Sequence, residues 1–216
     1  MGGSVNDRRR YTSPARREQA RKTRRAILDA AHRLFAEKGY LATSVEDIAR
    51  EAGVARPTVF TSVGVKSQIL KEVIDLTLAG DDEPVPVRER PWFREALEEP
   101  DPHRMLRLHA RNMRMMYARC ADVYCAVESA AEADPDVGAL WQAMQRWRLM
   151  GSRFVAESLA GKTRLRDGYD ADTVADMLWS IATPMVYRKL VRERGWSPEQ
   201  YERWLADLLC RALLPD

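Results

Sequence analysis

The sequence is poor in cysteine and has no long apolar run. Its 216 residues include 3 cysteines, at positions 120, 125 and 210, and no two have CxxC spacing. This spacing argues against a disulfide framework and against a zinc site. We expect buried thiols, and a redox role for Cys120 and Cys125 is the alternative. No stretch approaches the about 18 apolar residues of a membrane-spanning helix, and the N-terminus lacks a signal-peptide core, so we expect a cytoplasmic protein that enters no membrane.

Motifs of catalysis and metal binding are also absent from the sequence. We find no glycine loop for phosphate, no HExxH and no defensible Ser-His-Asp order. His32 and His103 have no partner at metal-ligand spacing. The sequence therefore predicts no enzyme activity, no cofactor and no metal site.

Positive charge is concentrated at the N-terminal end. The first 66 residues contain 14 Lys and Arg against 7 Asp and Glu, a net charge of +7, whereas the remainder carries −4. This asymmetry favours contact with a polyanion, and a solvated tail is the alternative. The densest cluster comprises Arg8, Arg9, Arg10, Arg16, Arg17, Arg21, Lys22, Arg24 and Arg25. We expect a flexible basic arm over residues 1–15 that contacts nucleic acid.

Three helical segments are predicted from Pro14 onward. Apolar residues recur at helical spacing after Pro14, and Gly39 is placed to end that helix. A capping box then starts a second helix near Val45, with Thr43 and Glu46 or, in an equally good register, Ser44 and Asp47. Gly53 ends this helix, and a third begins after three or four residues, with Pro57 in its first turn. The pattern predicts a helix-turn-helix, although an ordinary corner between two core helices uses the same residues.

The segment AILDAAHRLFAEKGYLATSVEDIAREAGVARPTVFTSVGVKSQIL resembles the N-terminal domain of TetR-family transcriptional regulators over about 45 residues. The resemblance implies an all-α fold of about nine helices. A three-helix DNA-binding head over residues 16–66 would carry a larger helical body over residues 67–216 that binds an effector and dimerises. LWSIATPMVYRKLVRERGWSPEQYERWLADLL is similar to the C-terminal helix pair of many actinobacterial members.

The resemblance also implies the residues that contact DNA. Thr43 or Ser44, together with Lys66, match positions that contact phosphates, and Arg56, Thr58 and Thr61 match the recognition helix. The full expected set also contains Pro57, Phe60, Ser62, Arg16, Arg21 and Arg24. An arginine in the major groove can donate two hydrogen bonds to a guanine.

Two departures from the family pattern affect this set. Ala55 replaces the serine that usually caps the third helix. The usual T-[hydrophobic]-Y-x-[H/Y]-F becomes Thr58-Val59-Phe60-Thr61-Ser62-Val63, which lacks the tyrosine hydroxyl and the larger polar ring that normally touch the backbone. The basic arm is expected to compensate for these lost phosphate contacts.

The rest of the chain reads as helices separated by one loop. A fourth helix follows Lys66 and ends at Gly80, and the proline-rich segment 81–91 is expected to be a loop. Helical patterns resume near Pro102, near Pro135, at 171–194 with a kink at Pro184, and at 198–214. The apolar stripes of these helices are either core or the wall of a ligand pocket.

Methionines and aromatics mixed with a few polar groups favour a pocket for an apolar or aromatic effector. The expected lining is Met105, His109, Asn112, Met116, Tyr124, Trp141, Met144, Trp147 and Trp179. The surplus apolar surface of the last two helices favours a four-helix interface between two protomers. Its expected residues are Met177, Ile181, Trp204, Leu205, Leu208 and Leu209.

The predicted function is that of a ligand-responsive transcriptional regulator. We expect a repressor that binds a palindromic site in double-stranded DNA as a homodimer and is released by a small effector. One alternative is an architectural protein that binds DNA of any sequence without an effector. Another is an enzyme or carrier for an apolar metabolite with a vestigial head.

Overall fold

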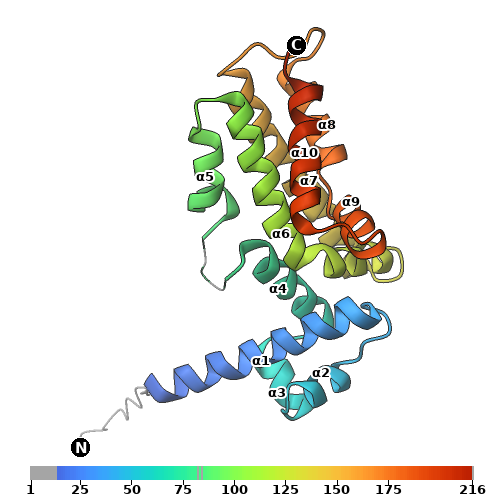
Figure 1. Cartoon of the computed structure of the whole chain (residues 1–216). Coiled ribbons are helices and arrows are strands. Elements are labelled where there is room, and N and C mark those ends of the chain that lie inside the picture. The colour runs from blue at the N-terminus through green and yellow to red at the C-terminus, as the bar shows by residue number, and fades with distance from the viewer. Residues whose placement is uncertain (1–13, 82, 84, 216) are drawn as a thin grey trace, which may run out of the picture.

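The all-helical expectation is confirmed by a computed structural model, which describes residues 14–81, 83 and 85–215. Ten α-helices and no strand occur in this part of the chain. In Figure 1 the first three helices form a head below, and α5 to α10 form the body above, with α4 leading from one to the other. The helices are α1 (Pro14–Lys38), α2 (Val45–Glu51), α3 (Arg56–Ser62), α4 (Lys66–Ala79), α5 (Pro91–Glu98), α6 (Pro102–Ala130), α7 (Pro135–Ala160), α8 (Ala171–Ile181), α9 (Pro184–Tyr187) and α10 (Pro198–Leu213).

The predicted helix-turn-helix is present in the head. The chain turns after α2 through Gly53, whose φ of +67° is a left-handed conformation that glycine adopts without strain. Of the two possible capping registers, the structure forms the one with Ser44 and Asp47. The Asp47 amide donates to Ser44 Oγ at 3.0 Å, and the Ser44 amide donates to Asp47 Oδ2 at 3.1 Å. These bonds satisfy amides that the helix itself leaves without partners.

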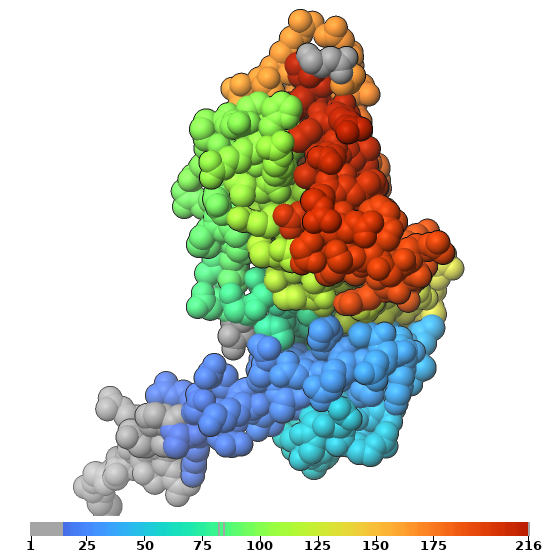
Figure 2. All heavy atoms as spheres, in the orientation of Figure 1, coloured from blue at the N-terminus to red at the C-terminus, as the bar shows by residue number. Residues whose placement is uncertain are grey.

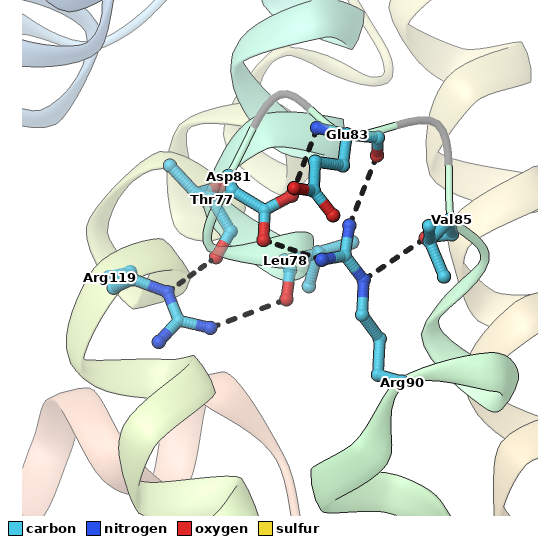
Figure 3. A network of polar contacts seen from close by, with 7 residues as sticks. All are labelled: Thr77, Leu78, Asp81, Glu83, Val85, Arg90 and Arg119. Atoms are coloured by element: carbon cyan, nitrogen blue, oxygen red, sulfur yellow. Dashed lines mark hydrogen bonds and ion pairs between the residues drawn. The ribbon is translucent and has the colours of Figure 1, made fainter.

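The helix α4 ends at Gly80, as predicted, and an arginine fixes that end to the body. Arg119 of α6 donates from Nε to the Thr77 carbonyl at 3.0 Å and from a terminal nitrogen to the Leu78 carbonyl at 3.4 Å (Figure 3). Gly80 has φ +93°, and a Cβ there would lie 3.2 Å from the Arg119 guanidinium. A positive charge at the C-terminal end of a helix is favourable because the last carbonyls carry partial negative charge.

The segment 81–91 was expected to be a loop, and that expectation is only partly correct. It contains the 3-10 turn η1 (Val87–Glu89) and is held by Arg90, whose side chain is buried. Arg90 donates to the carbonyls of Glu83 and Val85, each at 3.1 Å, and to Asp81 at 2.5 Å (Figure 3). A buried guanidinium needs these partners, so Arg90 holds the described residues of this segment, which we call the connector.

The helix α5 was not predicted. Its apolar residues Phe93 and Ala96 are buried against the body, but the helix has only eight residues and follows a proline-rich, charged stretch. Such a short segment gives a weak periodic signal.

A single helix over 171–194 with a kink at Pro184 was also wrong, because the structure breaks the helix completely. α8 ends at Ile181, and Thr183 takes an extended conformation as the cap of the next helix. Its Oγ1 accepts from the Val186 amide at 3.1 Å, so a new helix starts at the proline. Proline suits a first helical position because it has no N–H to offer. The chain then continues through the π-helical turn η2 (Arg188–Glu193).

The core consists of two hydrophobic clusters. The first lies within the body and joins α5 and α6 to the later helices. The second cluster, which we call the junction core, begins in the head with residues such as Ile27 and Val59 and continues into the body. Its body members are Val123, Tyr124, Val127, Ala130, Val137, Leu140 and Met144. In the space-filling view the head lies directly against the body, and α10 covers much of the visible face of the body (Figure 2).

Candidate DNA-binding surface and ligand cavity

The recognition helix α3 is anchored on one side and open on the other. Val59 is fully buried in the junction core, whereas Arg56, Pro57, Phe60 and Thr61 are exposed. Thr58 and Ser62 are half-buried. No side chain caps the helix, because Ala55 stands at the capping position. The helix therefore presents polar groups and one aromatic ring on its outer face.

Arg56 is held across the face of α3 before any DNA is present. Its Nε lies 2.6 Å from Glu46 Oε1 of α2, and its guanidinium lies 5.3 Å from the centre of the Phe60 ring. Both charged side chains are more than half exposed, so the ion pair contributes little to stability. Its effect is orientation, since it keeps an arginine on the surface that α2 and α3 share.

The residues expected at phosphates differ in how accessible they are. Thr43 is buried, and its hydroxyl donates to the Gly39 carbonyl at 2.8 Å, so its side chain supports the turn before α2. Ser44 is exposed at the start of α2. Lys66 Nζ donates to the carbonyls of Tyr40 and Thr43, each at 3.0 Å, and lies 4.0 Å from the Tyr40 ring centre. Burial lowers the pKa of Lys66. Its ammonium group stabilises the turn between α1 and α2 through these two hydrogen bonds.

Some basic residues of α1 are exposed to solvent, and others contact neighbouring helices. Arg16 and Arg21 are exposed, and Arg21 pairs with Glu18 of the same helix at 3.2 Å. Arg24 forms an ion pair with Glu72 of α4 and donates to the Ser62 carbonyl at 3.4 Å. Arg24 thereby ties the end of α3 to two other helices. The expected contacts from Arg8, Arg9 and Arg10 lie outside the described residues.

A cavity of about 150 Å³ lies in the body between the two hydrophobic clusters. Tyr124 and Met144 of the junction core form part of its wall, and Met113, Tyr117 and Leu178 of the body cluster form another part. Five of the expected residues line the cavity, namely His109, Met116, Tyr124, Met144 and Trp147.

Four other expected residues do not line this cavity. Met105 is fully buried in the body cluster, and Asn112 donates to the Trp92 carbonyl at 2.8 Å. Trp141 packs edge-on against Tyr124, with ring centres 5.2 Å apart. Trp179 lies behind Arg148, 5.6 Å from the guanidinium. These side chains support the wall rather than form it.

The sequence analysis did not predict the charged group of the cavity wall, Arg148. It lines the cavity together with the unexpected residues Phe93 and Tyr117. It stands four residues after Met144 and seven after Trp141, so helical spacing places it on the apolar side of its helix. A charged residue on the apolar side of a helix was the signal from which Arg148 could have been predicted. His109 in the same wall is buried, its Nε2 makes no hydrogen bond within the described part of the chain, and burial lowers its pKa to about 4.

A larger groove of about 900 Å³ opens beside this cavity, between the head and the body. It is lined by Arg21, Arg24 and Arg25 of α1, by the C-terminal half of α4, by the connector and by α7. Residues common to both spaces are Leu78, Val87, Phe93, Trp147 and Gly151. Since Trp147 is also exposed, this shared wall offers a ligand a path from solvent into the cavity.

The head matches a known family. The family model described as bacterial regulatory proteins, tetR family, aligns with residues 27–73. This head is a TetR-family domain. The regulator AcrR of Shigella flexneri is 38% identical over 61 residues, and this match covers 28% of each chain. The match therefore spans about a quarter of that relative and concerns the TetR-family head alone.

Solved structures extend the likeness to the fold of the body. NalD of Pseudomonas aeruginosa, described as the secondary repressor of the MexAB-OprM multidrug efflux pump, is 23% identical with a TM-score of 0.67. That alignment covers 90% of this chain and 98% of NalD. SmeT, solved as a complex with triclosan, is 22% identical with a TM-score of 0.67, covering 90% of this chain and 92% of SmeT. The TetR-family head thus carries a body of the same fold as these two proteins.

The residues expected at a dimer interface fall into two groups. Leu205 and Leu209 are fully buried within the body, where α10 packs on α6. Met177, Ile181, Trp204 and Leu208 are only half-buried. Only this second group has apolar surface left to offer a partner.

Among the helices that the structure describes, none has the length and apolar character needed to cross a membrane. No group of three or more His, Cys, Asp or Glu side chains in that part of the chain is arranged to hold a metal ion.

Proposed function

We propose that this protein is a ligand-responsive transcriptional repressor that binds a palindromic operator as a homodimer and is released by a small apolar or aromatic effector. Residues 16–66 would bind DNA, and residues 67–216 would bind the effector and dimerise. The basic residues 1–15 would add contacts to the DNA backbone. The observation that carries this proposal is the cavity wall, because Tyr124 and Met144 belong to the same continuous cluster as the core of the head.

This shared wall provides a mechanical connection between ligand and DNA. A ligand that displaces Tyr124 or Met144 has to repack the junction core, and α1 and α4 contact α6 in that core. Packed cores change between discrete arrangements rather than deform continuously. An effector that prefers the arrangement with wrongly spaced recognition helices therefore shifts the population away from DNA.

The DNA-binding step follows from the geometry of the head. With α3 in the major groove, Arg56 is placed to donate to a guanine, and Thr58 and Thr61 to meet a thymine methyl group. Exposed Ser44, at the start of α2, is placed to meet a phosphate. Two heads related by a two-fold axis read half-sites about 34 Å apart, or a multiple of that distance.

The names of the similar proteins support repression and a ring-containing effector. NalD is named as a repressor and SmeT was solved with triclosan, which indicates what bodies of this fold accommodate. These relatives are regulators, and on that ground we propose no enzyme activity for this chain. The alternative, an architectural DNA-binding protein without effector, gives no role to a cavity between the two clusters.

The test is to select genomic DNA fragments on the purified protein at near-physiological salt and to sequence what is retained. An enriched palindrome supports a specific dimeric regulator. Diffuse retention without a common motif contradicts it and favours the architectural alternative. Its binding would also depend strongly on salt, since backbone contacts release counterions.

A further inference from the structure

We infer that the body cavity selects an anion, namely a ring-sized apolar carboxylate whose charge is received by Arg148. This inference rests on the proposed function and adds the chemical class of the effector. It begins with the position of one cation. Arg148 lines a cavity that is otherwise mostly apolar, and in the described part of the chain it makes no ion pair.

The surroundings of Arg148 are neutral. A terminal nitrogen donates to Gln145 Oε1 at 3.1 Å, and the other donates to the carbonyls of Trp179 and Ala182 at 2.5 and 3.3 Å. The guanidinium also lies 6.0 Å from the centre of the Tyr124 ring. Arginine is a permanent cation in proteins, so a full positive charge lies beside the cavity. Most arginines in the described residues, by contrast, reach a carboxylate, as Arg114 reaches Glu202.

A purely structural role explains only part of this arrangement. The helix break after α8 leaves the Trp179 and Ala182 carbonyls without helical donors. Arg148 donates to both, and the Tyr117 hydroxyl also donates to the Ala182 carbonyl, at 2.6 Å. Carbonyls at a helix end carry only about half a negative charge. In addition, these bonds use the two terminal nitrogens, and Nε–H donates to no acceptor among the described residues. These contacts therefore leave the net charge of Arg148 and its Nε–H available to a ligand.

A second polar group in the wall, His109, has an atom that the described residues leave unsatisfied. His109 is 6% exposed, and its Nε2 makes no hydrogen bond with the described residues. Burial keeps this imidazole neutral at pH 7, so the site is not crowded by a second positive charge. A neutral imidazole offers one hydrogen bond of either sense, as its tautomer requires. Since unsatisfied buried polar atoms are costly, this nitrogen gains from a polar ligand atom.

The remaining lining sets the size and the polarity of the rest of the ligand. Phe93, Met113, Met116 and Leu178 contribute apolar surface, and the volume of about 150 Å³ is that of cavities that accept a single benzene-sized ring. Methionine side chains adapt to ring edges. A compound with one aromatic ring and one carboxylate matches both the apolar wall and Arg148.

The test compares two probes that have the same ring and length but differ in charge, phenylacetate and phenylacetamide. Their dissociation constants are measured at pH 7 by isothermal titration calorimetry on the full chain, on Arg148→Gln and on Arg146→Gln. Arg146 is an exposed arginine on the same helix and is the matched control. We expect wild type and Arg146→Gln to bind the acid about tenfold or more tightly than the amide, because a hydrogen bond to a charged partner is the stronger kind.

In Arg148→Gln the preference for the acid should fall to within about threefold, which is below the smallest effect expected of a charged hydrogen bond. Arg148→Lys keeps the charge and should keep part of the preference, which guards against a glutamine variant that misfolds. The inference is overturned if wild type binds the amide as tightly as the acid. It is also overturned if the preference survives in Arg148→Gln, or if neither probe binds at millimolar concentration.

A parallel DNA-retention assay separates this inference from the proposed function. If the amide binds better than the acid and releases operator DNA, the regulator stands and the anion preference fails. If the wild-type protein enriches no DNA motif, the proposed function fails whatever the probes do.

Discussion

The hydrogen bond between Tyr40 and Asp134 offers the sharpest test of how the head is joined to the body. Tyr40 follows α1 in the head and is buried, and its hydroxyl donates to Asp134 Oδ2 at 2.8 Å. Asp134 caps α7 of the body by accepting from the amides of Asp136 and Val137. The substitution Tyr40→Phe removes this one bond and keeps the ring that packs against Phe35.

The expected loss of stability follows from the partners. A hydrogen bond to a charged acceptor contributes about 1.5–3 kcal/mol. Because Asp134 is half-exposed and water can replace the lost donor, we expect the lower end, about 1–2 kcal/mol. For a chain of this size that corresponds to a fall in Tm of about 2–8 °C. Urea denaturation at fixed protein concentration measures it, and Tyr169→Phe is the control because that ring is exposed.

The effect should also depend on pH. The Tyr40 hydroxyl is the main cause that holds the pKa of Asp134 below its ordinary value of 3.8. A carboxyl with a lowered folded-state pKa stabilises the fold above the ordinary value, and this stabilisation is lost as the pH falls through the folded-state pKa. The difference between wild type and Tyr40→Phe should therefore be constant from pH 7 to about 5 and shrink below about 4. Equal stability at pH 7, or a difference unchanged at pH 3, would refute the reasoning.

Three further predictions concern DNA and assembly. Arg56→Ala should weaken operator binding by about 1–3 kcal/mol and relax the base preference at one position of the site. Glu46→Gln removes a negative charge from the same surface and should strengthen binding to every sequence. Mobility shifts with single-base operator variants measure both effects. Arg21→Gln should weaken binding to all sequences and lower the salt slope by about one, and an unchanged slope would remove Arg21 from the contact set. Leu208→Arg should give a folded monomer with weak operator binding, whereas Leu209→Arg should unfold the chain because that side chain is fully buried; light scattering and circular dichroism separate the two outcomes.

Local signals predicted the head well. Gly39, Gly53 and Gly80 mark helix ends, and each has the positive φ that glycine tolerates best. The capping register could not be chosen from the sequence, because Thr43 and Ser44 are both good caps. Burial decides between them, since the Thr43 hydroxyl turns inward to the Gly39 carbonyl.

The body was harder to predict because its details depend on contacts between distant residues. The break before Pro184 leaves carbonyls of Trp179 and Ala182 that accept hydrogen bonds from side chains distant in sequence, Arg148 and Tyr117. Five of the nine expected lining residues were predicted correctly from the apolar stripes, but a stripe does not distinguish the cavity wall from the core. Met105 and Met116 lie on the same helix, and only Met116 faces the cavity.

The composition of the cavity wall restricts how such a protein can change its ligand. Substitutions at Tyr124 or Met144 would reshape the cavity but would also disturb the junction core, on which the head packs. Met113 and Leu178 face the same cavity from the other cluster, so they can vary without that cost. New specificities, whether evolved or engineered, should accumulate first on the side of the cavity that faces away from the DNA.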